Sequence, residues 1–341
     1  MEIKKLFRMR VRDTLAGVAL LCLALPASAA LTTFETYTGA VGYSADGWGS
    51  TSGSGQITAF VPEGSTVLAA YLYTSTYNFD SSAFNYGGTL NGVPVTYTSL
   101  GVIPDACCNL QAGRVDVTSI VQPVIDGGPG GVYTFDITET NRFNQDGSAL
   151  VVVYTNDSLP ESTFAILDGF ARVTAETTTV NFADPLDPNA DGFFAEMALG
   201  IGFSALGQAS EVTVNGQLLT GNAGNFDDGL QQANGSLITV GGWNDPFSPI
   251  NPTYAEDTER YNLVPFINSG DTSITIDTFN ATKDDLIFLA MFHVSGIAGF
   301  NEPPPPPPPS GVPEPGTVAL LGLGLLGMAV AQRRRKLVVS G

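Results

Sequence analysis

The stretch DPLDPNADG, residues 184–192, has the most suggestive spacing of oxygen ligands in the sequence. Asp187, Asn189 and Asp191 alternate with other residues and are followed by a glycine, as in the pattern D-x-N-x-D-G. In calcium loops of this kind the alternate side-chain oxygens converge on the ion, and the glycine allows the chain to turn sharply. The spacing therefore predicts calcium as a cofactor of this loop.

The same loop departs from the EF-hand pattern, which has an acidic residue at its twelfth position. Counted from Asp187, that position is Ala198, and Glu196 comes two residues too early. A calcium loop of another geometry, with Asp184 as a further ligand, remains one interpretation. The other is an acidic surface turn, because Asp, Asn, Pro and Gly are the residues that turns use.

Catalytic groups are sparse. His293 is the single histidine, and it lies in the apolar run LAMFHVSG, where a packed core residue is more common than a general base. The sequence contains neither a G-x-S-x-G elbow nor a phosphate-binding P-loop. We therefore expect a protein that is not an enzyme and has no catalytic residues. The alternative is a secreted enzyme that acts on extracellular polysaccharide through paired carboxylates, which an acidic sequence supplies in many combinations.

Charge narrows the range of partners. Residues 30–300 hold 5 of the 14 basic side chains and 29 of the 33 acidic ones. So acidic a surface repels nucleic-acid phosphates and anionic membranes, which excludes nucleic acid as a partner. Divalent cations and neutral or cationic polymers are compatible with it.

A row of tyrosines suggests one such polymer. In the extended run AAYLYTSTY, Tyr71, Tyr73 and Tyr77 share one face, with Trp48 as a further aromatic residue. If exposed, this row would suit stacking on the rings of an extracellular polysaccharide. If a second sheet covers it, the tyrosines are core residues.

The elements that position these residues are strands. Short runs rich in β-branched and aromatic residues are separated by clusters of Gly, Asn, Asp and Pro, which predicts an all-β protein. These runs span residues 55–60, 66–76, 132–138, 149–155, 163–174, 211–216 and 272–279.

Two halves of the chain repeat a similar order of segments. The repeat pairs Asn91 with Asn215, Arg114 with Arg260 and Asp136 with Asp277. Because each alternating strand needs a second sheet to cover its apolar face, we expect two tandem β-sandwich domains of jelly-roll type. One larger sandwich with a chance similarity is the alternative. The expected domains and segments are residues 1–29 (signal peptide), 30–160 (first sandwich), 161–300 (second sandwich), 301–311 (proline-rich spacer) and 312–341 (tail).

The N-terminus predicts export. A basic stretch, an apolar run over residues 15–25 and the sequence PASAA form the three parts of a signal peptide, expected to be helical and cleaved after Ala29, with Ala27 as the other small residue. In an exported protein the adjacent Cys107 and Cys108 are expected to form a local disulfide, with pairing between chains as the alternative.

The C-terminus combines three different features. Val312, Pro313, Glu314 and Pro315 precede an apolar run of 15 residues, 317–331, and the run is followed by a basic cluster that includes Arg333, Arg334 and Arg335. We expect the apolar run to form a short transmembrane helix, although stable spans usually need about 17 to 25 residues. The basic cluster marks its cytoplasmic side.

This ending closely resembles the PEP-CTERM sorting signal of Gram-negative bacteria. The resemblance implies that a membrane-embedded exosortase recognises Pro313, Glu314 and Pro315, removes the tail after a transient stay in the inner membrane, and delivers the body to the cell surface or extracellular matrix. The segment from Arg114 to Tyr154 also loosely resembles uncharacterised β-domains of bacterial and archaeal surface proteins. We therefore expect an exported structural or adhesive protein of an exopolysaccharide layer or biofilm, processed by signal peptidase and exosortase.

Overall fold

The computed structural model describes residues 31–49, 52–76, 84–103, 109–141, 143–204, 207, 209–225, 237–242, 245–249 and 258–304. These residues form four β-sheets of antiparallel strands, with the short helix α1 (Thr118–Ile125) and the 3-10 helix η2 (Val264–Phe266) between strands. The prediction of an all-β protein is confirmed. Within the described part of the chain, none of the helices is long and apolar enough to cross a membrane.

Strands from the first half of the chain form two sheets. Sheet I has the order β3 (Ser54–Val61), β9 (Gly131–Glu139), β5 (Gly87–Leu90) and β6 (Val93–Thr96). Sheet II has the order β2 (Val41–Gly49), β10 (Gln145–Thr155), β4 (Thr66–Thr76), β8 (Gln111–Asp116) and β7 (Thr98–Val102).

Strands from the second half form the other two sheets, joined by β1 from the start of the described chain. Sheet III has the order β1 (Thr32–Gly39), β11 (Ser162–Asp168), β19 (Leu286–Ser295), β13 (Ala195–Ser204) and β16 (Leu237–Val240), and β17 (Arg260–Asn262) also pairs with β13. Sheet IV has the order β15 (Gln217–Ala223), β14 (Ser210–Val214), β18 (Ser273–Asn280), β12 (Glu176–Phe182) and β20 (Ala298–Phe300).

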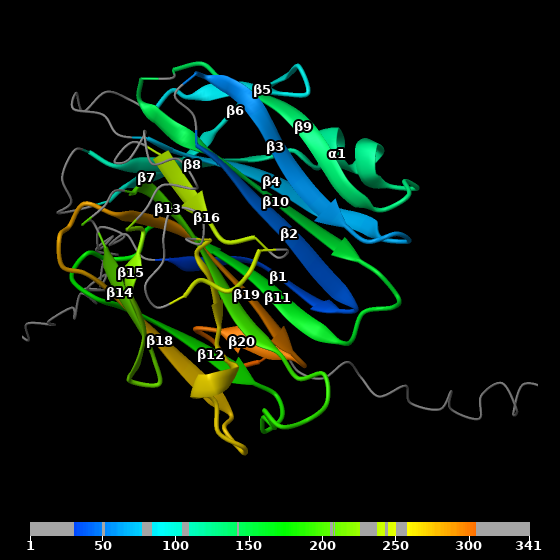
Figure 1. Cartoon of the computed structure of the whole chain (residues 1–341), viewed down its shortest axis with the longest axis vertical. Coiled ribbons are helices and arrows are strands. Elements are labelled where there is room, and N and C mark those ends of the chain that lie inside the picture. The colour runs from blue at the N-terminus through cyan, green and yellow to red at the C-terminus, as the bar shows by residue number, and fades with distance from the viewer. Residues whose placement is uncertain are drawn as a thin grey trace, which may run out of the picture.

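The four sheets stack in the order I, II, III, IV, with a hydrophobic core in each of the three gaps (Figure 1). Helix α1 packs beside β4 and contributes Val121 and Ile125 to the core between sheets I and II. Sheets II and III are covered on both faces, which explains why apolar residues follow one another without alternation over residues 149–154 of β10 and 286–292 of β19. Sheets I and IV have one exposed face, so β9 and β18 alternate between apolar and polar residues.

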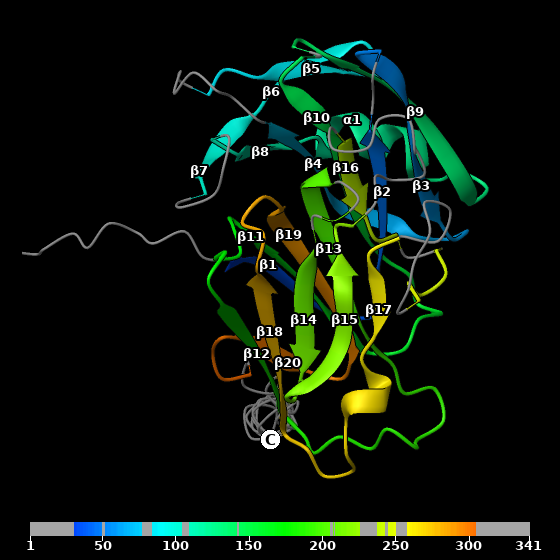
Figure 2. The same cartoon turned by 60° about the vertical axis from the view of Figure 1, so that its left-hand side comes forward.

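The same strand order occurs in both halves of the stack (Figures 1 and 2). The series β2, β10, β4 and β8 in sheet II corresponds to β11, β19, β13 and β17 in sheet III, and β3, β9, β5 and β6 in sheet I correspond to β12, β18, β14 and β15 in sheet IV. Within each half these strands also follow one another in the same sequence order. The halves therefore share one topology over eight strands each.

The two tight hairpins show which residues correspond. Asn91 and Asn215 have φ of 48° and 50°, and each is followed by a glycine of positive φ, as two-residue hairpin turns require. The side-chain oxygen of Asn91 accepts a hydrogen bond from the backbone of Asp136, and that of Asn215 accepts one from Thr275. Asp136 therefore corresponds to Thr275. The sequence pairing of Asp136 with Asp277 was wrong by two residues, because alternation alone leaves a strand's register open to even shifts.

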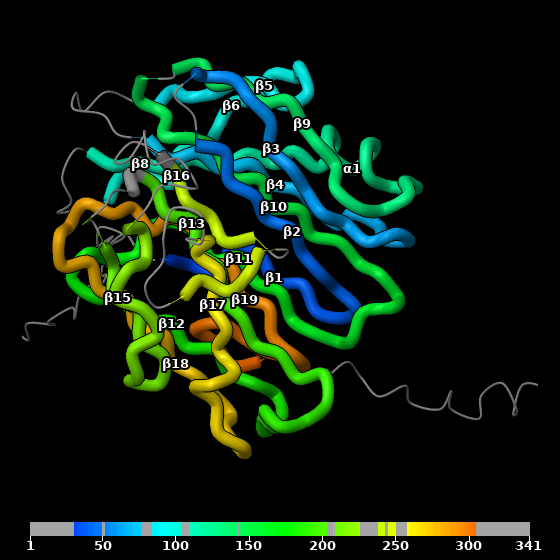
Figure 3. The backbone as a smooth tube through the Cα atoms, in the orientation of Figure 1, coloured from blue at the N-terminus to red at the C-terminus, as the bar shows by residue number. Residues whose placement is uncertain are grey.

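Strand β1 crosses between the halves. It directly precedes β2 in sequence, yet it pairs with β11 at the edge of sheet III, from Thr32 opposite Asp168 to Gly39 opposite Ser162. The chain then passes through sheets I and II before it returns to sheet III at β11, as the tube in Figure 3 shows. The start of the described chain therefore closes the edge of a sheet built from the second half.

Candidate functional site

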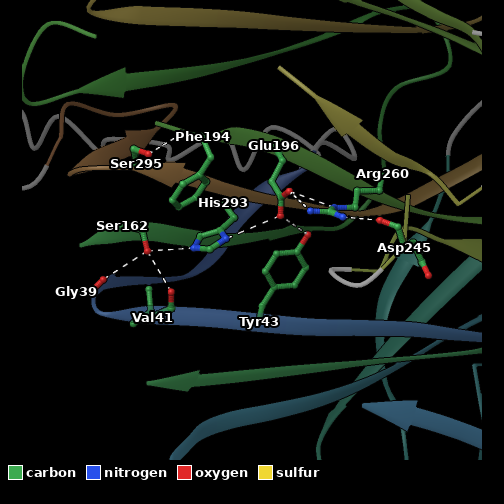
Figure 4. A network of polar contacts seen from close by, with 10 residues as sticks. All are labelled: Gly39, Val41, Tyr43, Ser162, Phe194, Glu196, Asp245, Arg260, His293 and Ser295. Atoms are coloured by element: carbon green, nitrogen blue, oxygen red, sulfur yellow. Dashed lines mark hydrogen bonds and ion pairs between the residues drawn. The ribbon is translucent and has the colours of Figure 1, made fainter. Parts of the chain in front are cut away.

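A buried ion pair lies where sheets II and III meet. Glu196 on β13 and Arg260 on β17 are brought side by side by the pairing of these strands, and Arg260 Nη2 donates to Glu196 Oε2 at 2.5 Å. Tyr43 on β2 donates its hydroxyl to Glu196 Oε1 at 3.1 Å, which links the two sheets (Figure 4). The Arg260 guanidinium also donates to the carbonyl of Asp245 and lies over the ring of Phe247. Burial raises the pKa of Glu196, and Arg260 limits that rise.

A second group of the same composition lies elsewhere in this interface. Asp168 on β11 pairs with Arg114 on β8, and Tyr73 on β4 donates its hydroxyl to Asp168 at 3.0 Å. The Arg114 guanidinium lies 3.3 Å from the centre of the Phe34 ring. In one group a tyrosine on β2 meets an acid on β13, and in the other a tyrosine on β4 meets an acid on β11. Since β2 corresponds to β11 and β4 to β13, the two halves meet through equivalent surfaces, as the subunits of a two-fold dimer do.

His293 joins the first group to a serine. Its Nε2 lies 3.1 Å from Ser162 Oγ, and its Nδ1 lies 3.9 Å from Glu196 Oε1. Serine, histidine and carboxylate in this order resemble a nucleophilic triad. However, Ser162 is fully buried and His293 is 5% exposed, so a substrate cannot reach them. Burial lowers the pKa of His293 to about 4, so the ring is neutral at pH 7. The arrangement is that of a packed core histidine.

Further buried acids lie outside this interface. Burial, together with the nearby Asp146, raises the pKa of Glu139 to about 9. Burial, with Asp284 and Glu259 nearby, raises the pKa of Asp285 to about 8. Asp146 lies near the start of β10 and Asp285 directly precedes β19, and each accepts a serine hydroxyl, from Ser75 and Ser210 respectively. Strongly perturbed carboxyls of this kind are candidates for functional roles.

The predicted calcium loop, residues 184–192, is an exposed connection between β12 and β13. Asp187 Oδ1 accepts the backbone N–H of Asn189 at 3.1 Å, and the Asp187 carbonyl accepts that of Ala190, so this carboxylate closes a turn. Asp184 and Asp187 line a cavity of about 190 Å³, while Asp191 is exposed. Among the described residues, no group of three or more His, Cys, Asp or Glu has the arrangement of a metal site. Calcium at Asp184, Asp187, Asn189 and Asp191 therefore stays a prediction.

The tyrosine row is covered. Tyr71 is 7% exposed, and Tyr73 is fully buried in the core between sheets II and III. The hydroxyl of Tyr71 lies 3.0 Å from that of Tyr37 on β1. The interpretation of an exposed stacking row was wrong for these two residues, because sheet III lies over that face. Tyr77 is outside the described residues.

Several predicted sites lie outside the described residues. They are the signal-cleavage residues Ala27 and Ala29, the cysteines Cys107 and Cys108, and the sorting residues Val312, Pro313, Glu314, Pro315, Arg333, Arg334 and Arg335.

The interface groups were missed by the sequence analysis. Arg114 and Arg260 did stand out there as matching positions, but only as markers of the repeat. The available signal was that two of the few basic residues of an acidic body occupy corresponding places in the two halves. A basic side chain surrounded by many acidic ones is expected to form an ion pair. Their partners Asp168 and Glu196 come from other strands, so spacing along the chain does not reveal them.

Comparison with known proteins identifies the tail. Residues 311–336 match the PEP-CTERM protein-sorting motif, so the chain carries the C-terminal sorting signal of an exported exosortase substrate, and this prediction is confirmed. No curated protein matches the chain.

Among solved structures, the chain is similar to BuGH86wt in complex with neoagarooctaose, at 12% identity and a TM-score of 0.23 over 80% of this chain and 36% of that one. It is also similar to a β-porphyranase of glycoside hydrolase family 86 from the human gut bacterium Bacteroides plebeius, at 10% identity and a TM-score of 0.17 over 74% of this chain and 36% of that one. TM-scores this low support no conclusion about fold or activity.

Proposed function

We propose that the protein is a structural or adhesive component of the cell surface or extracellular matrix, held in an exopolysaccharide layer such as that of a biofilm. The observation that carries the proposal is the sorting motif at residues 311–336, which assigns the chain to an export route. The acidic body is compatible with contacts to neutral polymer. Signal peptidase and exosortase are its processing partners, and the tail passes transiently through the inner membrane.

We also propose that the body consists of two jelly-roll domains, over residues 30–160 and 161–300, with β1 exchanged onto the second. The support is the strand order. In each half, one four-stranded series and its partner series follow the jelly-roll arrangement of two interlocked Greek keys.

The two ends of the body lie close together, which suggests how it is presented. Leu31 and Asn301 line the same cavity, and Thr33 Oγ1 donates to the carbonyl of Phe300 at 3.0 Å. The predicted proline-rich spacer, residues 301–311, begins at this point in the sequence. If the body is attached to the cell surface through this end, sheets II and I point away from the attachment. Sheet I is then the layer farthest from the cell surface.

The exposed face of sheet I offers polar groups to a polymer. The exposed polar side chains on this face include Gln56 on β3, Thr96 on β6, and Thr134 and Asp136 on β9, whereas the Thr58 hydroxyl is held by Asp46 of β2. Hydroxyl, amide and carboxylate groups spaced along a sheet are suited to hydrogen bonds with sugar hydroxyls, and water-bridged contacts extend their reach. We therefore assign the polymer contact to this face.

The experiment uses exopolysaccharide from the producing bacterium, immobilised on beads. Wild-type protein should be retained without releasing new reducing ends, and the variant with Thr96→Val and Thr134→Val, two exposed threonines of this face on β6 and β9, should be retained several-fold less. The matched control is Thr179→Val with Thr275→Val, a cross-strand pair on sheet IV. Equal retention of both variants contradicts the sheet I assignment. Release of reducing ends that a single carboxylate substitution abolishes contradicts the structural role and favours the enzyme.

A further inference from the structure

One end of the core between sheets I and II has buried oxygen atoms for which no hydrogen-bond partner is found. They are both carboxylate oxygens of Glu139, the side-chain oxygen of Gln111 and the hydroxyl of Thr76. Thr76 is fully buried, and Gln111 is 4% exposed. A buried polar atom without a partner costs about 1–3 kcal/mol, and more when it is charged, so several at one place call for an explanation.

The strand register shows that these side chains point into the same core, the one between sheets I and II. Thr76 on β4 lies directly opposite Gln111 on β8, so both side chains project from the same face of sheet II. That face looks toward sheet I, because Leu72, four residues before Thr76, belongs to the core between the two sheets. Glu139 follows Phe135 and Ile137 of the same core by even steps along β9, so it projects from sheet I toward sheet II.

Hydrogen bonds place Glu139 at the same end of this core as Thr76. Thr140 and Asn141, the next two residues, both donate to Gln145 Oε1, and Gln145 lies directly opposite Thr76 in sheet II. The β9–β10 turn thus holds the end of sheet I against the end of β4. The groups come from three strands, β4, β8 and β9, and converge on one end of the sandwich.

The chemistry of these atoms is that of cation ligands. All are oxygens, and they include a carboxylate, an amide carbonyl and a hydroxyl, which are the ligand types that Ca²⁺ accepts in irregular geometry. Asp146 adds a second negative charge within electrostatic reach of Glu139. Among the described residues, no basic side chain acts on the Glu139 carboxyl, whose environment keeps it protonated unless a cation takes the proton's place.

We propose that Glu139, Gln111 and Thr76 form a binding site for a divalent cation of the calcium type at this end of the first sandwich. The site joins sheets I and II, and it is separate from the loop at residues 184–192. It does not depend on the proposed surface role.

The test measures calcium binding to the purified protein after treatment with chelator, by calorimetric titration with CaCl₂ and by the melting midpoint with and without calcium. Glu139→Gln keeps the size of the side chain and removes its charge. Asp136→Asn makes the same chemical change on the exposed face of the same strand and serves as the matched control. Asp187→Asn separates this site from the loop, and Arg142→Gln removes the one basic side chain that the sequence has between β9 and β10.

We expect Glu139→Gln to lose one calcium ion per chain and the matching calcium-dependent rise in the melting midpoint, and Thr76→Val to weaken binding at least tenfold. Asp136→Asn, Asp187→Asn and Arg142→Gln should keep this ion. The proposal is overturned if wild-type protein binds no calcium, or if Glu139→Gln binds as many ions as wild type. A higher melting midpoint of Glu139→Gln in calcium also overturns it, because a buried acid without a cation is relieved by the neutral amide.

Discussion

Replacing Arg260 by methionine tests whether the buried ion pair at the interface holds sheets II and III together. Methionine keeps most of the apolar length of the side chain but removes the partner of Glu196, whose side chain is 4% exposed. The Tyr43 hydroxyl still donates to Glu196 in the variant. The remaining charge must either stay buried without its cation or take up a proton.

Proton uptake sets the size of the effect. Breaking a buried pair by removing one partner costs about 3–5 kcal/mol. Protonating a glutamate of ordinary pKa 4.5 at pH 7 costs about 3 kcal/mol, which caps the electrostatic part of the loss. We therefore expect Arg260→Met to lower the free energy of unfolding by about 3 kcal/mol at pH 7.

The dependence on pH follows from the same step. Burial already raises the folded-state pKa of Glu196 above 4.5, and removing Arg260 raises it further. The folded variant therefore binds a proton that the unfolded chain releases above pH 4.5, so its stability falls as pH rises. The defect should shrink to about 1 kcal/mol at pH 5.

Urea unfolding at pH 5 and pH 7 measures both quantities. Adding Glu196→Gln to Arg260→Met should recover at least half of the loss, because the neutral amide still accepts the Tyr43 hydrogen bond and needs no cation. Lys283→Met, at an exposed turn, is the charge-matched control and should change stability by less than about 0.5 kcal/mol. A loss below about 1 kcal/mol at pH 7, or an equal loss at both pH values, would show that the Glu196–Arg260 pair does not hold the two sheets together.

Three further predictions concern separate features. A Cβ atom at Gly202 would clash with Ser75 across the interface, so Gly202→Ala should destabilise the protein by about 2–3 kcal/mol in urea unfolding. Gly221→Ala, where a Cβ atom meets nothing within 4 Å, is the control and should cost less than about 1 kcal/mol; equal losses would place the strain elsewhere. The imidazole of His293 should titrate near pH 4 by NMR, and a midpoint above 6 would contradict its burial. The unfolded chain takes up this proton already near pH 6.5, so the folded protein loses stability as the pH falls from 6.5 to 4. His293→Phe should lessen this loss. If loop 184–192 binds calcium, Asp187→Asn should lower the calcium content by one ion per chain, and an unchanged content would remove that site.

Local patterns were enough to locate most strands. The run at residues 66–76 predicted β4 with its observed bounds, and the alternation around residues 132–138 predicted β9 within a residue at each end. Both predictions succeed because burial of one or both faces of a sheet determines which residues of each strand are apolar. Helix α1 was missed, since eight residues with Pro123 inside give too short a stretch for a helical period to appear.

Relations between distant segments were harder to predict. The repeat was visible, yet the exposed or covered state of Tyr71 and Tyr73 depended on the stacking of sheet III on sheet II, which no local pattern encodes. The same holds for Glu196 and Arg260, whose contact follows from strand pairing over 64 residues. The buried oxygens near Glu139 likewise come from three separate strands, so they become apparent only in the folded chain.

The intact mass and the location of the protein in its own bacterium show directly whether the chain is an exported surface or matrix protein whose tail serves only for sorting. We expect a form that has lost residues 1–29 and the segment beyond the Pro313–Pro315 motif, found at the cell surface or in the extracellular matrix. A Glu314→Ala chain should instead keep its tail and remain with the membrane. A wild-type protein that retains residues 317–341 and stays in the inner membrane would show that the tail is a permanent anchor and not a sorting signal.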